Sequence, residues 1–452
     1  MPRRYIAKPT PGGSVTEAAL EAMDAEGLRA LIRELIPQLD QAPRARFVNG
    51  LVDRAARNAS GWVPDGPTDQ AVAEIVSFAK AATRAGRADP SEVDDYLRQG
   101  SNAFLAKDYR AAFQIFRALL LPLGNADIDL GQHEILDEVL GVDIAACAAQ
   151  YVVSMYMTAA PRNRAQAVLT AVDEVRGVSH FWEPLRELER VVVESLPDFE
   201  AFLSDWRLLI EERARRARCS DWDSDEDRWL REVVQRTGGA DGLAQVARST
   251  QRAGDLRAWC RALTGAKDWK VALDAYEEAA EIVDDKTYSR GEFLDGAALA
   301  AQELGRKDLP AKLDRAWREA PSMVRLRRWL GAANTKTTLR KRVSAALETI
   351  HRDEPRLVTP EIAGLIAMAD VAVPDNGTAR AGMVAAMRKA AEKRIEGVTE
   401  NKRRRHYEHA AALALTCARI DPEESTTWLA NICSEYRQYP ALQRELGTSP
   451  RR

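Results

Sequence analysis

Apolar residues in this chain recur at helical spacing, and segments with the alternating pattern of a β-strand are scarce. Residues 25–36, for example, place leucine and isoleucine on one side of a helix before Pro37 ends it. Alanine, leucine, arginine and glutamate dominate the composition, and these residues favour helices. Runs rich in β-branched and aromatic residues are short, so no substantial sheet is expected. The sequence therefore predicts an all-α protein.

The length of 452 residues allows two or three ordinary domains or one long repeat array. Hydrophobic residues make up 46% of the chain, enough for a continuous core. No stretch approaches the about 18 consecutive apolar residues of a spanning helix, and the N-terminus lacks the apolar region of a secretory signal. The five cysteines are scattered without a CxxC motif. We therefore expect a soluble cytoplasmic protein whose thiols pack as small hydrophobic groups.

Proline and glycine divide the helical pattern into blocks. A flexible N-terminus is expected at residues 1–14 and an N-terminal helical segment at 15–58. Residues 59–69 contain two prolines and two glycines, which mark a boundary. A helical domain is expected at 70–236 and a helical array at 237–452.

Local signals place several helix ends within these blocks. Asp89 and Pro90 make a well-formed helix start. A helix is also expected at 128–141, and another at 199–216, where Asp198 can cap the first turn. In the last block, short helices are joined at corners that contain a glycine or a lysine followed by an aspartate.

Residues 96–121, YLRQGSNAFLAKDYRAAFQIFRALLL, resemble a tetratricopeptide repeat, a two-helix unit, and the resemblance implies the following roles. Gly100 falls where the paired helix passes close to the first helix. Asp108 belongs to the turn, Ala112 is the small residue of the second helix, and Phe116 fills the gap to the next unit. Because a two-helix unit cannot bury its apolar face alone, such a pattern favours stacking of similar units.

Partial copies of this pattern occur later in the chain. Residues 269–282, WKVALDAYEEAAEI, repeat the second helix, with Ala272 as the small residue and Tyr276 as the aromatic one. Residues 297–321 and 407–422 give looser copies. These segments resemble the tetratricopeptide repeat (TPR).

The resemblance implies a divergent TPR-like α-solenoid that covers about half the chain. The copies fit no single period, and much of 124–236 does not match the pattern. A non-repetitive helical bundle or a HEAT-like stack is the alternative. A TPR-like array would offer a long surface to a protein partner, so the resemblance implies a non-enzymatic interaction scaffold or adaptor.

Two basic tracts are the candidate binding surface. Residues 321–346 carry seven basic residues and no acidic ones, and 388–405 carry eight basic and three acidic residues, although the net charge of the chain is −3. The same cations could bind phosphates, so a nucleic-acid-binding accessory protein is the alternative function. The residues expected to contact the partner are Arg325, Arg328, Lys336, Arg340, Lys341, Arg342, Lys402, Arg403, Arg404 and Arg405.

The segment DWDSDEDRWLRE has some features of a calcium-binding loop. Asp221, Asp223 and Asp225 take positions 1, 3 and 5 of such a loop, and Glu232 takes position 12. The sixth position lacks the glycine that the sharp turn requires. We therefore favour the alternative that Ser224 caps a helix with an acidic first turn, and we expect no metal ion.

Signals of catalysis are weak. The chain has no nucleophile elbow, phosphate-binding loop, dinucleotide fingerprint or HExxH motif, so no cofactor is expected. Arg404 and His409 have the R-x4-H spacing of a family of helical ribonucleases, but Arg405 stands where that family has a polar residue. An exposed basic helix start is the preferred interpretation, and no enzymatic activity is expected.

Overall fold

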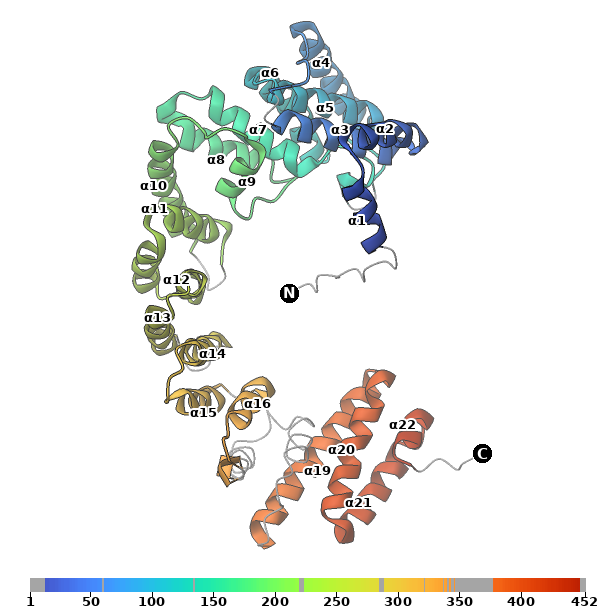
Figure 1. Cartoon of the computed structure of the whole chain (residues 1–452), viewed down its shortest axis with the longest axis vertical. Coiled ribbons are helices and arrows are strands. Elements are labelled where there is room, and N and C mark those ends of the chain that lie inside the picture. The colour runs from blue at the N-terminus through green and yellow to red at the C-terminus, as the bar shows by residue number, and fades with distance from the viewer. Residues whose placement is uncertain are drawn as a thin grey trace. The chain divides into compact units, whose positions relative to one another are not determined.

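The structure is a computed structural model that describes residues 13–58, 61–132, 135–218, 223–283, 288–320, 322–335, 337–339, 341–342, 345 and 377–447. Across these residues the regular secondary structure is helical, apart from an isolated bridge between Arg87 and Asp129. The all-α prediction is therefore confirmed. Among the described helices, none is both long and apolar enough to cross a membrane. The helices fall into two compact units, Met1–Thr237 and Gly238–Arg452 (Figure 1).

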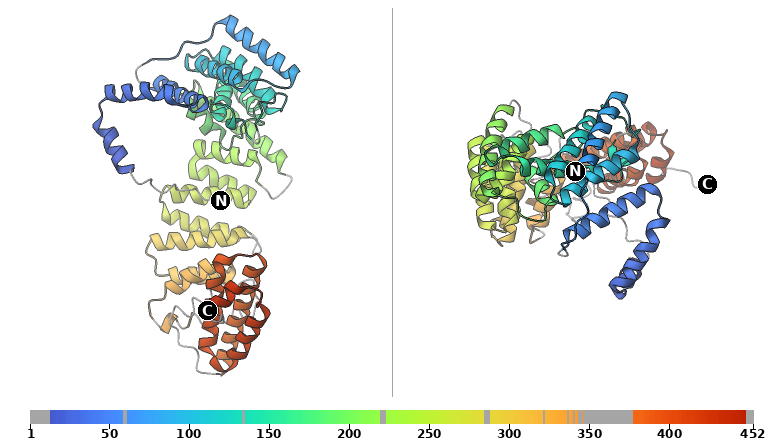
Figure 2. Two further views of the ribbon diagram at one scale, coloured as in Figure 1. Left: turned by 90° about the vertical axis from the view of Figure 1, so that its right-hand side faces the viewer. Right: turned by 90° about the horizontal axis from the view of Figure 1, so that it is seen from above.

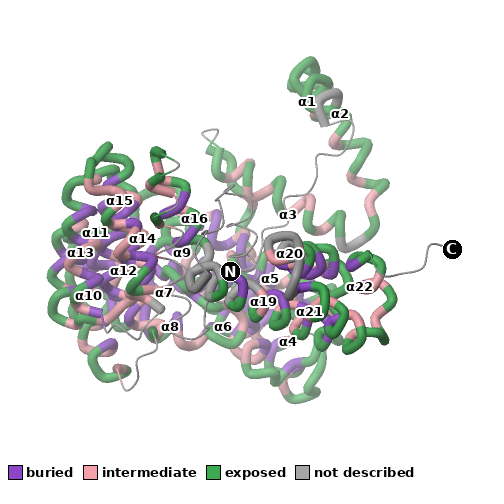
Figure 3. The backbone as a smooth tube through the Cα atoms, turned by 90° about the horizontal axis from the view of Figure 1, so that it is seen from below, coloured by how far each residue is buried: buried purple, intermediate pink, exposed green. Residues whose placement is uncertain are grey.

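The first unit opens with three helices joined by short links, α1 (Gly13–Ala22), α2 (Ala25–Leu35) and α3 (Gln41–Arg57), with a 3-10 turn η1 (Ile36–Gln38) after α2. It continues with α4 (Asp69–Ala85), α5 (Pro90–Leu105), α6 (Tyr109–Gly124), η2 (Leu136–Glu138), α7 (Ile144–Thr158), η3 (Pro161–Asn163), α8 (Arg164–Glu174), α9 (Pro184–Val191) and α10 (Phe199–Ala217). Figure 3 shows that burial begins beyond the first helices, and α2 contains no buried residue.

Two local predictions in this unit differ from the structure. The helix predicted at 128–141 is wrong, since the described part of that segment contains only the short turn η2. Its backbone is drawn away by the hydrogen bond from Asp129 N to Gly86 O (3.0 Å) and by the positive φ of Gly131. Asp198 does precede α10, but it adopts a left-handed conformation (φ 54°), and its carboxylate bonds to Arg164 instead of capping the helix.

The second unit contains α12 (Ala253–Gly265), α13 (Trp269–Ile282), α14 (Tyr288–Glu303), α15 (Leu309–Glu319), α16 (Met323–Gly331), α19 (Gly377–Glu400), η4 (Arg404–His406), α20 (Tyr407–Ile420), α21 (Pro422–Glu435) and α22 (Pro440–Glu445). Helix α11 (Asp225–Thr250) bridges the sequence boundary of the two units, and Gly239 interrupts its helical backbone. From α12 to α15, each helix packs against the next along the chain (Figure 2).

Two corners in different units share the same backbone hydrogen bonds. Between α5 and α6, Lys107 has φ 64°, its N–H donates to Phe104 O, and the N–H of Asp108 donates to Ala103 O. Between α12 and α13, Lys267 has φ 58°, its N–H donates to Thr264 O, and the N–H of Asp268 donates to Leu263 O. In both corners the aspartate carboxylate accepts a bond from the backbone three residues later. This is the Schellman arrangement, which satisfies the last carbonyl groups of a helix.

Two further corners follow the same rule with different side chains. After α14, Gly305 has φ 62° and the next residue, Arg306, donates to Ala301 O at 3.0 Å. After α19, Lys402 has φ 51° and Arg403 donates to Val398 O at 2.8 Å. The corners at Lys107 and Gly305 lie within segments whose sequence resembles a TPR, and the other two precede such segments.

Small residues permit close helix crossing in both units. A Cβ placed on Gly100 of α5 would lie 2.8 Å from Cε1 of Phe116 on α6, closer than real contacts allow. The predicted need for a small residue at Gly100 is therefore confirmed. A Cβ on Gly296 of α14 would lie 2.2–2.5 Å from three ring atoms of Tyr276 on α13.

Helices α12, α13, α14, α15 and α16 follow one another along the chain from Ala253 to Gly331.

Ion pairs join helices that are two apart in this series. Arg257 of α12 contacts Glu292 of α14 at 2.8 Å, and Lys312 of α15 pairs with Glu277 of α13. The partners of each pair are 35 residues apart in sequence. Partly exposed pairs of this kind contribute about 1 kcal/mol or less each.

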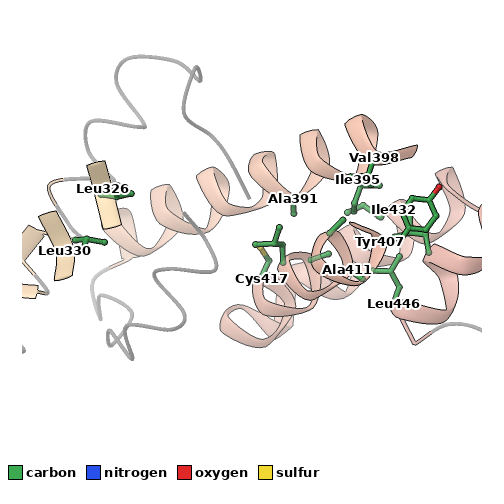
Figure 4. Packing of buried hydrophobic residues seen from close by; sticks show 14 of the residues in the cluster. Leu326, Leu330, Ala391, Ile395, Val398, Tyr407, Ala411, Cys417, Ile432 and Leu446 are labelled. Atoms are coloured by element: carbon green, nitrogen blue, oxygen red, sulfur yellow. The ribbon is translucent and has the colours of Figure 1, made fainter. Parts of the chain in front are cut away.

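Apolar packing continues from α14 to the C-terminal helices within the second unit. Trp317 and Leu330 of the earlier helices share one buried cluster with Tyr407 of α20 and Leu446, which follows α22 (Figure 4). Fully burying a side chain of this size contributes about 2 kcal/mol or more, so the cluster is a main source of stability for this unit.

The described cysteines behave as hydrophobic residues. Cys147, Cys260 and Cys417 are buried, and burial raises the pKa of each thiol to about 12. Cys433 is half-buried, and Cys219 lies outside the described residues. The prediction that these thiols pack as small apolar groups is confirmed for the three buried ones.

Candidate functional site

The first basic tract contributes two arginines to packing. Arg325 of α16 is only 8% exposed, and its guanidinium contacts Asp295 of α14 at 2.8 Å. It lies so close to Gly291 that a Cβ there would approach it to 2.5 Å. Arg328 also faces Asp295, at 3.5 Å. These two residues therefore hold α16 against α14 and do not present an open cationic surface.

The rest of this tract is only partly described. Arg342 donates a hydrogen bond to Trp329 O and lies 5.8 Å from the centre of the Trp329 ring. Burial lowers the pKa of Arg342, which fits a packed side chain and not a solvated one. Lys341 is exposed. Lys336 and Arg340 lie outside the described residues.

The first half of the second basic tract lies in α19, where Arg388 pairs with Asp421 at 2.9 Å, and its last four residues form the corner between α19 and α20. Lys402 and Arg403 make the backbone bonds of that corner, and Arg404 begins η4. The side chains of these residues and of Arg405 are exposed. Arg405 donates a hydrogen bond to Nε2 of its neighbour His406. The backbone of these residues thus forms the corner, and their side chains present four exposed cations.

The residues of the acidic segment serve separate local contacts. Ser224 Oγ accepts a hydrogen bond from Asp227 N at 3.1 Å, so the predicted helix cap is confirmed. Asp223 pairs with Arg231, and Asp225 pairs with Arg228. In the described part of the chain, no group of three or more His, Cys, Asp or Glu residues could hold a metal ion. Asp221 and the side chain of His409 lie outside the described residues.

Glu232, the last position of the proposed calcium loop, caps α9. Its carboxylate accepts hydrogen bonds from the backbone N–H groups of Leu185 (3.1 Å) and Arg186 (2.8 Å). Burial raises the pKa of Glu232 from its ordinary value of 4.5 to about 7, although these two bonds oppose the shift. The folded state therefore binds the proton more tightly than the unfolded state. The resulting stability is present below pH 4.5 and is lost as the pH rises through about 7.

A groove with a volume of about 1350 Å³ lies between α4 and α6 in the first unit. We call it the α4/α6 groove. Its apolar floor consists of Val72, Val76, Ala79, Ala111, Phe113, Ala118, Leu121 and Pro122. Its charged rim consists of Asp69, Lys80, Arg84, Asp108, Arg110 and Arg117.

The two helices of the groove run in the same direction. Immediately after α4, Ala88 N donates to Asp129 O at 3.2 Å, and Asp129 N donates back to Gly86 O at 3.0 Å. Asp129 follows the end of α6 by five residues, so the C-terminal ends of both helices meet at this bridge. Since α4 and α6 also pack side by side, their N-terminal ends lie together at the other end of the groove.

Charge is distributed unequally along the groove. Lys80, Arg84 and Arg117 lie in the C-terminal halves of their helices, whereas Asp69 and Asp108 lie at the N-terminal ends. Arg117 is paired with Glu174 of α8 at 3.2 Å. Lys80 and Arg84 are exposed and form no ion pair within the described part of the chain. The end of the groove where α4 and α6 terminate is therefore cationic. The other end is mixed, since the exposed Arg110 of α6 lies there with Asp69 and Asp108.

The wall behind α6 is rigidly packed. The ring of Phe113 stacks on Tyr151 of α7, with the ring centres 5.4 Å apart. The Tyr151 hydroxyl donates to Glu174, which also pairs with Arg117. Burial raises the pKa of Tyr151, so its hydroxyl keeps its proton and remains a donor to this carboxylate. The groove is thus preformed on one side.

The sequence pattern did not reveal this groove. Helix α4 has a buried apolar stripe that contains Ile75 and Ala79. Val76 lies beside this stripe and contributes to the floor of the groove. A wide apolar stripe on 69–85 was the available signal, but its pairing with α6 depends on tertiary structure. The sequence as a whole matches neither a known protein-family model nor a curated protein.

Proposed function

We propose that this protein is a non-enzymatic scaffold that binds a helical or peptide segment of a protein partner in the α4/α6 groove. The groove itself is the observation that carries the proposal. Its volume of about 1350 Å³ exceeds the roughly 300–1,000 Å³ of ordinary small-molecule pockets. Its combination of an apolar floor and a charged rim matches the composition of protein-recognition sites.

A TPR-like repeat architecture supports this function. The ion pairs Arg257–Glu292 and Lys312–Glu277 each join residues 35 positions apart, which is close to the 34 residues of a tetratricopeptide unit. The four Schellman corners and the glycine–aromatic crossings are those expected of stacked helical hairpins. We place the scaffold in the cytoplasm, since the four described cysteines are unpaired thiols.

Nucleic-acid binding is the second candidate function, and the exposed run from Lys402 to Arg405 favours it. The first basic tract adds little, because Arg325, Arg328 and Arg342 are engaged in packing. Phosphate binding through the exposed run would weaken steeply with salt and show little dependence on nucleotide sequence.

Affinity purification of the tagged protein from its own host, with and without nuclease, tests the scaffold proposal. We expect a stoichiometric protein partner that survives nuclease and is lost from the Lys80→Glu/Arg84→Glu variant. The matched control is Arg54→Glu/Arg57→Glu, which reverses two exposed cations at the C-terminal end of α3, away from the groove. Partner capture that is unchanged by the groove variant, or that disappears on nuclease treatment, would contradict the proposal.

A further inference from the structure

The floor of the α4/α6 groove offers few hydrogen-bonding groups to an occupant. The hydroxyl of Ser77 donates to Ala73 O at 2.8 Å, and that of Thr83 donates to Ala79 O at 2.8 Å. The backbone of α4 and α6 is bonded within each helix, except that Pro122 has no N–H to donate to Ala118 O. The amide of Gln114 is one further polar group of the lining. An extended peptide would therefore bury most of its backbone N–H and C=O groups without partners, whereas a helix satisfies its own.

The groove also has the length of a short helix. From Asp69 to Arg84, α4 advances by 15 residues, which corresponds to about 22 Å at 1.5 Å per residue. A bound helix of about 15 residues would span it. Alanines on both walls allow the axis of such a helix to approach closely, since Ala73, Ala79, Ala111 and Ala118 all line the groove.

Charge and helix dipoles together set a direction for the occupant. Lys80 and Arg84 lie at the end of the groove where α4 and α6 terminate. Neither cation has a carboxylate partner within the described part of the chain. The C-terminal ends of α4 and α6 carry partial negative charge, which attracts the positive N-terminal end of another helix. If the first turn of the bound helix is acidic, its carboxylates contact Lys80 and Arg84. The same carboxylates stabilise the bound helix, because its N-terminal end carries partial positive charge.

We propose that the groove takes an amphipathic α-helix with an acidic N-terminal end, lying antiparallel to α4 and α6. This inference rests on the proposed function and specifies the chemistry of the partner segment. The acidic end lies against Lys80 and Arg84, and the apolar face lies on Val76, Phe113 and Leu121. The C-terminal end of the occupant lies at the mixed end of the groove, near Asp69, Asp108 and Arg110.

Synthetic peptides of about 15 residues test this proposal with the full-length protein. One fluorescein-labelled peptide has leucines on one helical face, glutamates in its first two turns and lysines in its last turn. A second has the same residues with the charge order reversed. Since each exposed ion pair contributes up to about fivefold in affinity, we expect the first peptide to bind on the order of tenfold more tightly by fluorescence anisotropy.

Two variants identify the groove as the origin of this preference. In Lys80→Glu/Arg84→Glu the preference should disappear or invert, and in Arg54→Glu/Arg57→Glu it should persist, with circular dichroism checking that both remain folded. A photo-crosslinker at the N-terminus of the first peptide should attach to the C-terminal halves of α4 and α6. Attachment near Asp69 and Asp108 would overturn the antiparallel direction.

The outcomes separate this inference from the proposed function. Equal binding of the two peptides, while native partner capture still depends on Lys80 and Arg84, would overturn the inference alone. If neither peptide binding nor partner capture depends on the groove residues, both the inference and the proposed function are overturned.

A second copy of the chain is another possible occupant through the unburied α2. If the protein self-associates and Lys80→Glu/Arg84→Glu abolishes this association, the occupant of the groove is a second copy of the chain and not a partner helix.

Discussion

Substituting Gly296 tests the close packing of α13 on α14. Alanine at this position would place its Cβ 2.2 Å from Cε1 of Tyr276, where ordinary contacts begin at about 3.4 Å. The ring has limited freedom to move, because the Tyr276 hydroxyl is 3.2 Å from Thr264 Oγ. Overpacking of this kind costs about 1–3 kcal/mol, and the better helix propensity of alanine returns about 1 kcal/mol. The 2.2 Å approach places the cost at the upper end of that range, so we expect Gly296→Ala to lower the free energy of unfolding by about 2 kcal/mol.

Gly397 of α19 provides a matched control in the same unit. It is also helical, but a Cβ at this position would meet no atom within 4 Å. Gly397→Ala should therefore raise the free energy of unfolding by about 0.5–1 kcal/mol. Urea denaturation followed by tryptophan fluorescence measures both variants, and their midpoints should move in opposite directions.

A double-mutant cycle assigns the penalty to the tyrosine ring. In a Tyr276→Ala background the space for the new methyl group exists, so Gly296→Ala should become neutral or stabilising. A Gly296→Ala protein that is as stable as the wild type, with Tyr276 in place, would refute the close crossing of α13 and α14.

Two further predictions concern single side chains. Between about pH 4 and about pH 8, the free energy of unfolding of the wild type should fall by on the order of 3 kcal/mol relative to that of Glu232→Gln. The reason is that only the wild type loses a proton here, and the folded state holds this proton more tightly than the unfolded state. Denaturant titrations across this pH range measure the difference, and a difference that stays constant would show that the carboxyl is not buried. Arg325→Gln should lower the free energy of unfolding by about 1–3 kcal/mol, because Asp295 loses its charged partner and Ala320 O loses a donor. The exposed neighbour variant Arg327→Gln should stay within about 0.5 kcal/mol of the wild type, and equal effects of the two would contradict the packing role of Arg325.

The parts of the fold that depend on local chemistry could be predicted from the sequence. Gly100 was identified because a close crossing requires a small residue, and Ser224 because a hydroxyl before an acidic turn caps a helix. Both depend on residues within about one helical hairpin. The prediction of a helix at 128–141 failed because Asp129 N donates to Gly86 O, 43 residues earlier, and a periodicity argument contains no such contact.

The candidate site depended on longer-range information. The cations at Arg325 and Arg328 stood out by density, but Asp295, thirty residues earlier, takes up their charge. Lys80 and Arg84 look unremarkable in sequence, and they gain significance because α6 lies parallel to α4. Composition along the chain identifies clusters of charge, whereas ion pairing between helices decides which charges remain available to a partner.

Hydroxyl-radical footprinting of the captured complex tests the central claim most directly, because it reports the solvent exposure of individual side chains. Partner binding in the α4/α6 groove predicts reduced oxidation of Phe113 and Leu121 relative to the free protein. Leu208 of α10, which is 68% exposed and outside the groove, should be unchanged and serves as an internal control. Unchanged oxidation of Phe113 and Leu121 in a complex that contains stoichiometric partner would contradict the account.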